Sequence, residues 1–433
     1  MGYLSFFIEN WRFLTFGLLL TLCSSFGQTF FIGVYGTEFR GAFSLTHGDF
    51  GLIYSAATLA SATCLVWLGR KLDDVDLRRY ALLVSGGLVA ACFLMGAVPM
   101  AIFLFVAIFG LRLTAQGLMG HVAFTTMARY FSHERGKAVG IATLGKAGGQ
   151  ALLPILAVLL MTAVGWRASW LIFGAVLAVV LVPLALWLLG DHAERHDRLL
   201  GDMAASADET NPERRQWSRA EVLRHPHFYL LLPAVLAPSF ATTGLIFHQA
   251  HLVQSKGWSL TWFATCFIAF GTISLFTSLA TGSLIDRAGA RCLLPYYLMP
   301  LGLALLGLAA FDHPIMALVF MVGYGITAGA RSTIINTLWA EVYGVIHLGA
   351  IRAVVQTCMV VTSGLAPASF GILIDRGVTI EAIALASLLV LVIGTILAGL
   401  AIRGAAPPSP AANPYRRRNL NRQYSRRRPE EET

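Results

Sequence analysis

Long apolar runs occupy almost the whole of this chain and restrict what it can fold into. A run of about 20 apolar residues is long enough to cross a hydrocarbon core about 30 Å thick. Hydrophobic residues make up 56% of the 433 residues and charged residues only 13%, which is too little charge to cover a water-soluble surface. Inside lipid every backbone N–H and C=O must be paired within the protein, so the runs predict helices. We therefore expect an all-α membrane protein.

The apolar runs and the breaks between them predict twelve transmembrane helices. The first stretch has no basic n-region and no A-x-A-like cleavage site, so we interpret it as a span and not as a signal peptide. The predicted spans of the first half are 13–35, 51–69, 80–98, 101–127, 138–164 and 168–189. Those of the second half are 228–254, 259–283, 292–311, 314–339, 349–373 and 379–402.

Lysine and arginine are distributed unevenly between alternate loops, and this bias predicts the orientation in the membrane. If both termini are cytoplasmic, that side collects the segment 190–227, the tail, and Arg70, Lys71, Arg78, Arg79, Arg129, Arg135 and Lys137. The opposite side then has only Arg40, Arg167, Lys256 and Arg376. We therefore predict a multi-pass protein of a bacterial-type inner (plasma) membrane, with both termini in the cytoplasm.

Two polar segments set the predicted domain boundaries. Residues 190–227 are polar, contain proline and lack an apolar face, which predicts a flexible cytoplasmic linker with a candidate interfacial helix at 217–225. Residues 404–433 combine prolines with arginine clusters and predict a disordered basic tail, either a solvated topology anchor or a contact for anionic lipid. The predicted domains are a six-helix bundle at 1–189, the linker at 190–227, a second bundle at 228–403 and the tail at 404–433.

Several functional classes are not supported by the sequence. The net charge of +9 is concentrated in loops and tail, where it is a topology signal and not a nucleic-acid footprint. There is no P-loop, and no cluster of His, Asp or Glu has metal or nucleophile spacing. We expect no cofactor, no metal, no nucleic-acid partner and no enzymatic activity. Six cysteines lie in or at the ends of apolar stretches without a CxxC pair and read as small hydrophobic residues: Cys23, Cys64, Cys92, Cys266, Cys292 and Cys358.

Identical residues recur in the two halves at a constant offset of 213 residues. One coincidence would carry no weight, but these matches extend over several spans and loops. They predict two homologous six-helix bundles, a common way to build a transporter that holds its substrate between the halves. The matched pairs are Gly69 and Gly282, Asp73 and Asp286, Arg78 and Arg291, Gly110 and Gly323, Thr114 and Thr327, Ala115 and Ala328, Tyr130 and Tyr343, Gly136 and Gly349, and Pro154 and Pro367.

The loop after the eighth predicted span carries a recognisable motif. Residues 282–291 read GSLIDRAGAR, which resembles the G-x-x-x-D-R-x-G-x-R loop of the major facilitator superfamily. The equivalent loop at 69–79 keeps the glycine, aspartate and arginine but has Asp74 and Asp76 where that family usually has a basic residue and a glycine. Arg112, Gln116 and Gly117 resemble the family's fourth-span motif. The resemblance implies twelve transmembrane helices in two pseudo-symmetric six-helix bundles.

Three further passages narrow the resemblance. Residues 136–154, 338–352 and 371–377 look like bacterial members near the monocarboxylate and oxalate–formate exchanger branch of the superfamily. The resemblance implies a secondary transporter of small organic anions.

The two equivalent loops are interpreted as a gate latch. Asp73 and Asp286 are placed near helix ends, where a carboxylate can pair with arginine or cap a helix N-terminus. Such pairs form when the cytoplasmic side is closed and break when it opens; the alternative is plain topology charge. The candidate gating residues are Gly69, Asp73, Arg78, Gly282, Asp286, Arg287 and Arg291.

Cations inside the predicted spans are the most informative feature for function. Arg112, Lys146 and Arg331 lie well inside spans 4, 5 and 10, and no Asp or Glu lies at comparable depth. A lone charge at mid-membrane costs about 2.5 kcal/mol or more, so it needs a cavity and a partner. A substrate anion is the natural counter-ion. The alternatives are a structural bond from Arg112 to span 1, snorkelling of Lys146, and a pair between Arg331 and Glu341.

Polar residues inside other spans complete the predicted site. Gln116 and Gln150 follow Arg112 and Lys146 at helical spacing. His248 can carry or sense a proton, or it can be a hydrogen-bonded helix contact. The remaining candidates, which either line the path or bridge helices, are Gln28, Asn336 and Gln356.

The leading functional hypothesis is alternating-access transport of a small carboxylate, by proton symport or anion exchange. The expected partners are an anionic small molecule, lipid and, for symport, protons; the expected assembly is a monomer. The alternatives are a transporter of a larger metabolite such as a vitamin, an efflux pump, and a transporter-like sensor that signals through linker or tail.

Overall fold

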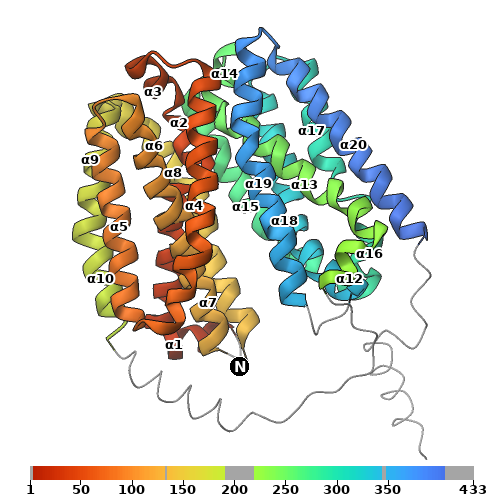
Figure 1. Cartoon of the computed structure of the whole chain (residues 1–433), viewed down its shortest axis with the longest axis horizontal. Helices are drawn as coiled ribbons and strands as arrows, with labels where there is room; N and C mark the ends of the chain where they lie inside the picture. Colours follow the sequence, from red (N-terminus) through yellow and green to blue (C-terminus); the bar gives the residue numbers. More distant parts are fainter. Residues whose placement is uncertain (1–2, 132–133, 191–218, 344–347, 405–433) are drawn as a thin grey trace, which may run out of the picture.

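The computed structural model describes residues 3–131, 134–190, 219–343 and 348–404 (Figure 1). Most of the predicted linker and all but the first residue of the predicted tail lie outside these ranges, so the predicted domain boundaries stay predictions. In the described part all regular elements are helices. Inside these ranges, the side chains of Asp73, Asp286 and Asn336 also lie outside what the structure describes.

The helices of the first half run up to residue 188. They are α1 Tyr3–Cys23, η1 Ser24–Gly27, α2 Thr29–Val34, α3 Gly36–Phe43, α4 His47–Asp74, α5 Leu77–Ala97, α6 Ala101–Leu111, η2 Arg112–Met119, α7 Gly120–Tyr130, α8 Arg135–Val164, α9 Trp166–Val176, η3 Leu177–Leu181 and α10 Val182–Leu188. The helices α6, η2 and α7 form one continuous span, as do α9, η3 and α10.

The helices of the second half begin with a short one, α12, at Arg219–Arg224, inside the segment 217–225 where a short helix was predicted. The others are α13 Pro226–Phe247, α14 Gln249–Ser255, α15 Leu260–Ala288, α16 Ala290–Leu293, α17 Met299–Ala310, α18 Ile315–Tyr343, α19 Leu348–Asp375 and α20 Ile380–Gly404.

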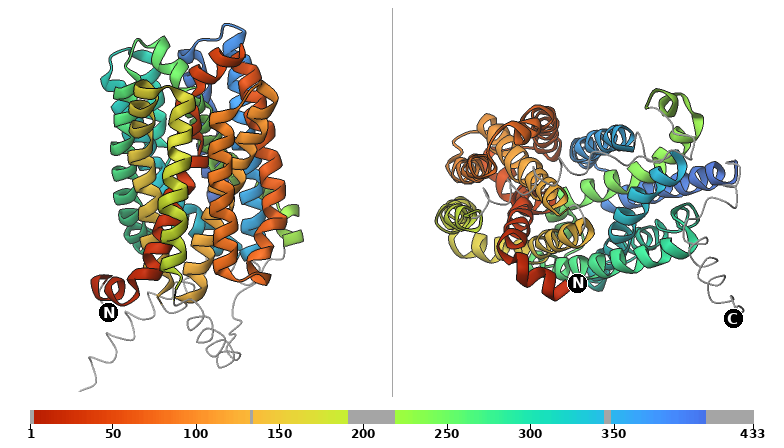
Figure 2. Two further views of the ribbon diagram at one scale, coloured as in Figure 1. Left: turned by 90° about the vertical axis from the view of Figure 1, so that its left-hand side faces the viewer. Right: turned by 90° about the horizontal axis from the view of Figure 1, so that it is seen from below.

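Eleven helical segments of the described chain are long and apolar enough to cross a membrane. The ninth predicted span, 292–311, differs because the structure divides it into α16, a series of turns and the 12-residue helix α17. Pro295 explains the division, since proline has no N–H and its ring clashes with the carbonyl four residues earlier. The first helix also extends beyond the predicted span 13–35: α1 begins at Tyr3 and kinks at Asn10, and its first turns lie aside from the bundle in Figure 2.

Two helical bundles lie side by side, the first in red to yellow and the second in green to blue (Figure 1). The same helix pairings recur in both. In the first bundle α1 packs on α8, α4 on α6 and α5 on α9. The equivalent pairs in the second are α13 with α19, α15 with α18 and α17 with α20. The sequence repeat is therefore matched by a repeat of helix contacts.

Two equivalent contacts join the bundles, α4 with α19 and α8 with α15. We call the end of the molecule where α10 ends and α12 begins the linker side, and the end with residues 44–46 and 376–379 the distal side. On the distal side the bundles meet backbone to backbone. A Cβ on Gly371 would collide with the His47 carbonyl, and one on Gly51 would lie 2.7 Å from the Pro367 carbonyl carbon.

A carboxylate from the second bundle reinforces this contact. Asp375, the last residue of α19, accepts hydrogen bonds from the backbone N–H groups of His47, at 3.0 Å, and Gly48, at 2.7 Å. The positive end of the α4 helix dipole favours a negative charge there. The distal side is therefore closed by one bundle capping a helix of the other.

A buried lysine ties together the distal ends of the second bundle. The Lys256 side chain is 1% exposed, and its Nζ lies 2.6 Å from Asp312 Oδ1 and 2.7 Å from Glu381 Oε1. Burial acts to lower the pKa of Lys256, but its bonds to the two carboxylates outweigh burial and raise that pKa. The indole of Trp258 adds a bond to the Asp312 carbonyl at 2.5 Å.

Substituting Gly371 by valine is expected to hold the distal side open, because the new side chain cannot fit against His47 and Gly48. The measurement is the reactivity of a cysteine at Gln28, in a background without the six native cysteines, towards an impermeant thiol reagent applied from the distal side. Gly371→Val should raise this reactivity, whereas Gly41→Val, at an exposed glycine with open space around it, should not. Equal reactivity in the two variants would contradict the closure described above.

Substituting Lys256 by methionine is expected to lower the stability of the protein by about 1.5–3 kcal/mol, the usual loss for a hydrogen bond to a charged group. Thermal unfolding in detergent, followed by intrinsic fluorescence, measures the change. The matched control is Arg376→Met, which removes an exposed positive charge at the same side and should leave the unfolding temperature unchanged. A Lys256→Met protein as stable as this control would show that the ion pairs do not support the fold.

Candidate functional site

A cavity of about 700 Å³ lies between the two bundles. On α8 its lining begins at Gly140 and Thr143, both exposed, only a short distance from the helix start at the linker side. Towards the distal side it ends at Phe30 and Phe267, whose ring centroids are 5.6 Å apart. The cavity is therefore accessible from the linker side and closed from the distal side.

The cavity brings together side chains from both halves of the sequence. Seven of the predicted site residues line it: Gln28, Arg112, Gln116, Lys146, Gln150, Arg331 and Gln356. The structure adds Ser239, Thr242 and Tyr324, which the sequence analysis did not single out. These three carry no charge and lie in apolar segments, so the sequence offered no signal for them.

A break in the first span shapes the cavity wall. After α1 the chain makes one 3₁₀ turn at Ser24–Gly27, Gln28 is extended with φ −79° and ψ 152°, and α2 begins at Thr29. Gly27 permits the break to pack on the fourth span, because a Cβ there would collide with the Leu111 carbonyl. The break turns the 28–30 segment towards the cavity, which all three residues line.

Arg112 holds this break in place. Its Nη1 donates to the Gly27 carbonyl at 3.1 Å, and its guanidinium lies 5.2 Å from the centroid of the Tyr54 ring. The Tyr54 hydroxyl in turn lies 2.7 Å from Thr29 Oγ1. Arg112 begins a stretch of π-helical geometry that ends at Met119, a local widening often found at functional sites. The bond to span 1 is the structural alternative considered for Arg112 from the sequence.

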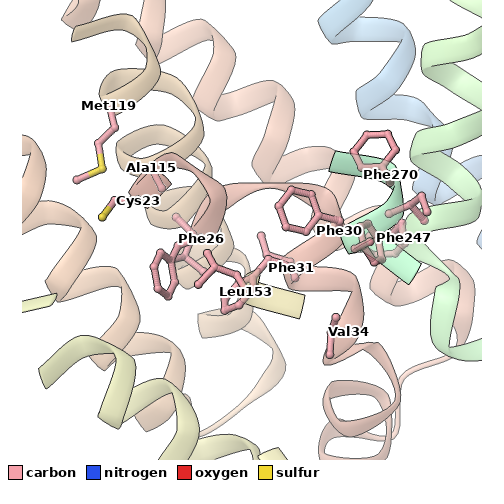
Figure 3. Packing of buried hydrophobic residues seen from close by; sticks show 14 of the residues in the cluster. Cys23, Phe26, Phe30, Phe31, Val34, Ala115, Met119, Leu153, Phe247 and Phe270 are labelled. Carbon is pink, nitrogen blue, oxygen red and sulfur yellow. The ribbon is translucent and has the colours of Figure 1, made fainter. Parts of the chain in front are cut away.

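Buried side chains pack densely around the break (Figure 3). Phe26 and Phe31 meet edge to face with ring centroids 5.0 Å apart, and both contact Phe173. Phe30 points the other way, to Phe267 of the second bundle. The Gln249 side chain of the second bundle donates to the Phe30 carbonyl at 2.7 Å. The break thus forms part of the contact between the bundles.

Lys146 extends from α8 into the cavity and has no hydrogen bond or ion pair to the described residues. Small residues beside Lys146 fix the position of its helix, α8, against the first span. A Cβ on Gly145 would collide with the Leu18 carbonyl, and one on Gly149 would collide with Ser25. The two glycines, four residues apart, let α8 and α1 approach closely. The lysine is therefore held by a rigid helix contact, while its ammonium has no partner in the described part of the chain.

Arg331 reaches the same cavity from α18. Its Nη1 donates to the Ser239 hydroxyl, and it has no carboxylate partner among the described residues. The alternative pairing with Glu341 does not occur. Instead, the Glu341 carboxylate accepts from the backbone N–H groups of Ala290, at 3.0 Å, and Arg291, at 3.3 Å. The described lining contains no Asp, Glu or His, so its positive charges are not neutralised by protein groups.

Two predicted site residues do not join the described lining. His248 lies at the distal closure, 4% exposed, with Nε2 2.9 Å from the Pro367 carbonyl. This is the hydrogen-bonded helix contact considered for it as an alternative. The side chain of Asn336 lies outside what the structure describes.

The two predicted gate loops lie on the linker side. The Gly69 carbonyl there accepts a hydrogen bond from His121 Nε2 at 3.2 Å, and Arg291 donates to the Glu341 carbonyl at 3.0 Å. Arg78 and Arg287 are exposed. Because the side chains of Asp73 and Asp286 are not described, the latch stays a prediction. Gly282 has open space around it, with Thr333 at 4.0 Å.

Two carboxylates have capping roles in these loops that the sequence analysis did not assign to them. Asp76 caps α5 by accepting from the Arg79 N–H at 3.1 Å, and Glu341 caps α16. Asp76 carried a usable signal, since an aspartate directly before an apolar helix is a typical N-cap. Glu341 did not, because it lies about 50 residues along the chain from the helix that it caps.

Comparison with known proteins assigns the family. The sequence model described as "Major Facilitator Superfamily" matches residues 17–367 of the chain. The chain belongs to the major facilitator superfamily. It is thus a multi-pass membrane transporter and not an enzyme, and the twelve-helix, two-bundle architecture is that of its family.

Named relatives and solved structures agree with this assignment. The chain is similar to monocarboxylate transporter 12 from Rattus norvegicus, at 24% identity over 90% of this chain and 85% of the relative. It matches the mouse and human proteins of the same name at 24% identity, over 84% of this chain and 80% and 75% of the relatives. A bacterial homolog of the human lysosomal transporter Spinster, in an inward-facing and occupied conformation, shares the fold with a TM-score of 0.66 and 17% identity, over 94% of this chain and 100% of that one.

Arg112 and Lys146 should respond in opposite ways to removal of their charge. Arg112→Met is expected to lower the unfolding temperature, because it removes a charged hydrogen bond worth about 1.5–3 kcal/mol from the span 1 break. Lys146→Met is expected to raise it, because it removes an unpartnered cation from a poorly solvated wall. Thermal unfolding of the ligand-free protein measures both. A destabilised Lys146→Met protein would mean that the ammonium has a structural partner.

Proposed function

We propose that this transporter carries a small organic anion, a carboxylate, by alternating access. The observation that carries the proposal is the pair Lys146 and Arg331, one from each bundle, in a described cavity lining without a carboxylate. Buried cations are costly unless paired, and an anion entering the cavity is the partner they lack. The similarity to proteins named monocarboxylate transporter 12 supports the same substrate class.

The proposed cycle begins in the conformation described above. An anion enters from the linker side and pairs with the Lys146 ammonium and the Arg331 guanidinium, a planar fork suited to a carboxylate. Because the cations belong to different bundles, the bound anion draws the bundles together on the linker side. The distal contacts of Gly51, Gly371 and Asp375 then separate, and the anion leaves on that side.

Arg112 is assigned a positioning role in this cycle. Its bond to the Gly27 carbonyl keeps the break in span 1 packed against the fourth span and places Gln28 and Thr29 on the cavity wall. Gln116, Gln150 and Gln356 supply neutral donors around the two cations. These amides can bind the second oxygen of a carboxylate or a polar group elsewhere on the substrate.

We further propose that the linker side faces the cytoplasm of a cell whose inner (plasma) membrane holds the protein. The support is the excess of lysine and arginine in the loops of that side. The described cavity then opens to the cytoplasm. The predicted boundaries 1–189, 190–227, 228–403 and 404–433 divide the chain into the two moving bundles, the linker between them and the tail.

Neutralising either cation should weaken anion binding. Each of Lys146→Gln and Arg331→Gln removes a charge-assisted contact of about 1.5–3 kcal/mol, which corresponds to about 10- to 100-fold weaker binding. The measurement is thermal stabilisation of the purified protein by a panel of mono- and dicarboxylates, followed by uptake into liposomes for those that bind. Neutral analogues, such as the corresponding amides, should give no stabilisation.

The control for this experiment is Arg376→Gln, which removes an exposed charge from the distal side without touching the cavity. It should bind and transport as the unaltered protein does. Binding of a carboxylate that both cavity variants retain in full would contradict the proposed anion site. Stabilisation by neutral metabolites alone would favour the alternative of a larger polar substrate.

A further inference from the structure

Three histidines from the two bundles meet at the distal closure. His47 begins α4 in the first bundle, whereas His248 ends α13 and His251 lies in α14 of the second. The ring centroid of His47 is 4.5 Å from that of His251 and 5.7 Å from that of His248. Because these contacts cross the boundary between the bundles, the rings must separate whenever the distal side opens.

The cluster has a nitrogen available for a proton. His47 Nδ1 is buried and has no hydrogen-bond partner among the residues that the structure describes. His248 already makes two contacts. Its Nε2 donates to the Pro367 carbonyl, and its ring packs edge to face on Phe247 with the ring centroids 4.9 Å apart. Burial disfavours the charged form of an imidazole, so the closed cluster binds protons less readily than a solvated histidine, whose pKa is about 6.5, and acid favours the conformation that exposes the rings.

The charges around the cluster decide what protonation does. Arg40 of α3, Asp375 of α19 and Glu381 of α20 act on the rings. Asp375 is already bound by the first N–H groups of α4, and Glu381 by Lys256. Asp49, the other nearby carboxylate of α4, is held in the capping box with Thr46. Of the two carboxylates that act on the rings, only Asp375 has no bound lysine or arginine in the described part of the chain, and it faces three imidazoles, one guanidinium and the positive end of a helix.

We propose that His47, His248 and His251 form a proton-binding site and that its protonation opens the distal side. Asp375 can offset a first added proton. A second proton places two imidazolium rings 4.5–5.7 Å apart across the closure, beside Arg40. Like charges at that separation repel, and separation of the bundles removes the repulsion. Acid therefore favours the distal-open conformation, and neutral pH favours the closure described here.

This site deepens the proposed function by adding a second binding site to the transport cycle. It rests on alternating access and does not depend on what the substrate is. The described cavity lining has no Asp, Glu or His, so the proton and the anion bind at separate places. Protons then act on transport through the conformation of the distal side. Uptake of an anion from an acidic distal side should accordingly be faster than from a neutral one.

The test measures the opening of the distal side without substrate. Spin labels at Gly41→Cys and Arg376→Cys, one exposed position on each bundle, report the distance across that side in a background without the native cysteines. Double electron–electron resonance spectroscopy at pH 7.5 and pH 5.5 should show a second, longer distance between the labels. The fraction of molecules with this longer distance should grow several-fold on acidification. The double variant His47→Gln, His251→Gln should give the same distribution at both pH values.

His313→Gln is the matched control, because His313 is an exposed histidine of the distal loops outside the cluster. It should keep the full pH response. An unaltered protein whose distances do not change with pH would overturn the proposal, and so would a double variant that still responds. Fluorescence-detected size exclusion of the double variant establishes that it is folded before its distances are compared.

Asp375→Asn supplies a second measurement. Removing this carboxylate leaves the first proton without an offset and weakens the cap on α4, so the distal-open population should appear at a higher pH than in the unaltered protein. A midpoint displaced to lower pH would contradict the electrostatic account. The proton site and the anion site can be tested independently. If the Lys146 and Arg331 variants retain carboxylate binding, the proposed substrate class fails, while the pH response of the distal side is unaffected.

Discussion

The requirement that membrane-embedded backbone groups find partners governs this structure, and one place where the chain departs from regular helix organises the rest. Span 1 breaks at Ser24–Gln28, and Arg112 supplies the hydrogen bond that the Gly27 carbonyl receives. The break turns Gln28 and Thr29 to the cavity and gives Phe30 a contact with the second bundle. The cavity wall, the contact between the bundles and the buried charge of Arg112 therefore share one origin.

Much of the fold follows from patterns that a sequence displays directly. Apolar run lengths predicted the spans, and the 213-residue offset predicted paired bundles whose helix contacts repeat as α1 with α8 and α13 with α19. The departures are local. Pro295 interrupts the predicted span 292–311, a signal that was present in the sequence and outweighed by hydropathy. The break at Ser24–Gln28 carried no comparable signal, because its stability comes from Arg112, 85 residues away.

The site was predictable to the extent that charge is costly in lipid. Lys146 and Arg331 stood out because unpaired cations are rare there, and the structure places both on one cavity. The sequence alone does not distinguish a cation that lines a cavity from one that holds the fold together. The structural role of Arg112 becomes visible only in its hydrogen bond to the Gly27 carbonyl. The cap that Asp375 places on α4 could not be predicted from the sequence, since its partners His47 and Gly48 lie 328 and 327 positions away from it in the chain.

The two ion pairs of Lys256, with Asp312 and Glu381, have a mechanical consequence for the proposed transport cycle. The Lys256 ammonium fastens the end of α14, the turn before α18 and the start of α20 at a single buried point. Helix ends fastened at one point cannot slide independently, so the second bundle behaves at its distal end as a stiff lever. In the proposed cycle the hinge then lies between the bundles, and a rotation there moves the distal end of the second bundle as one unit.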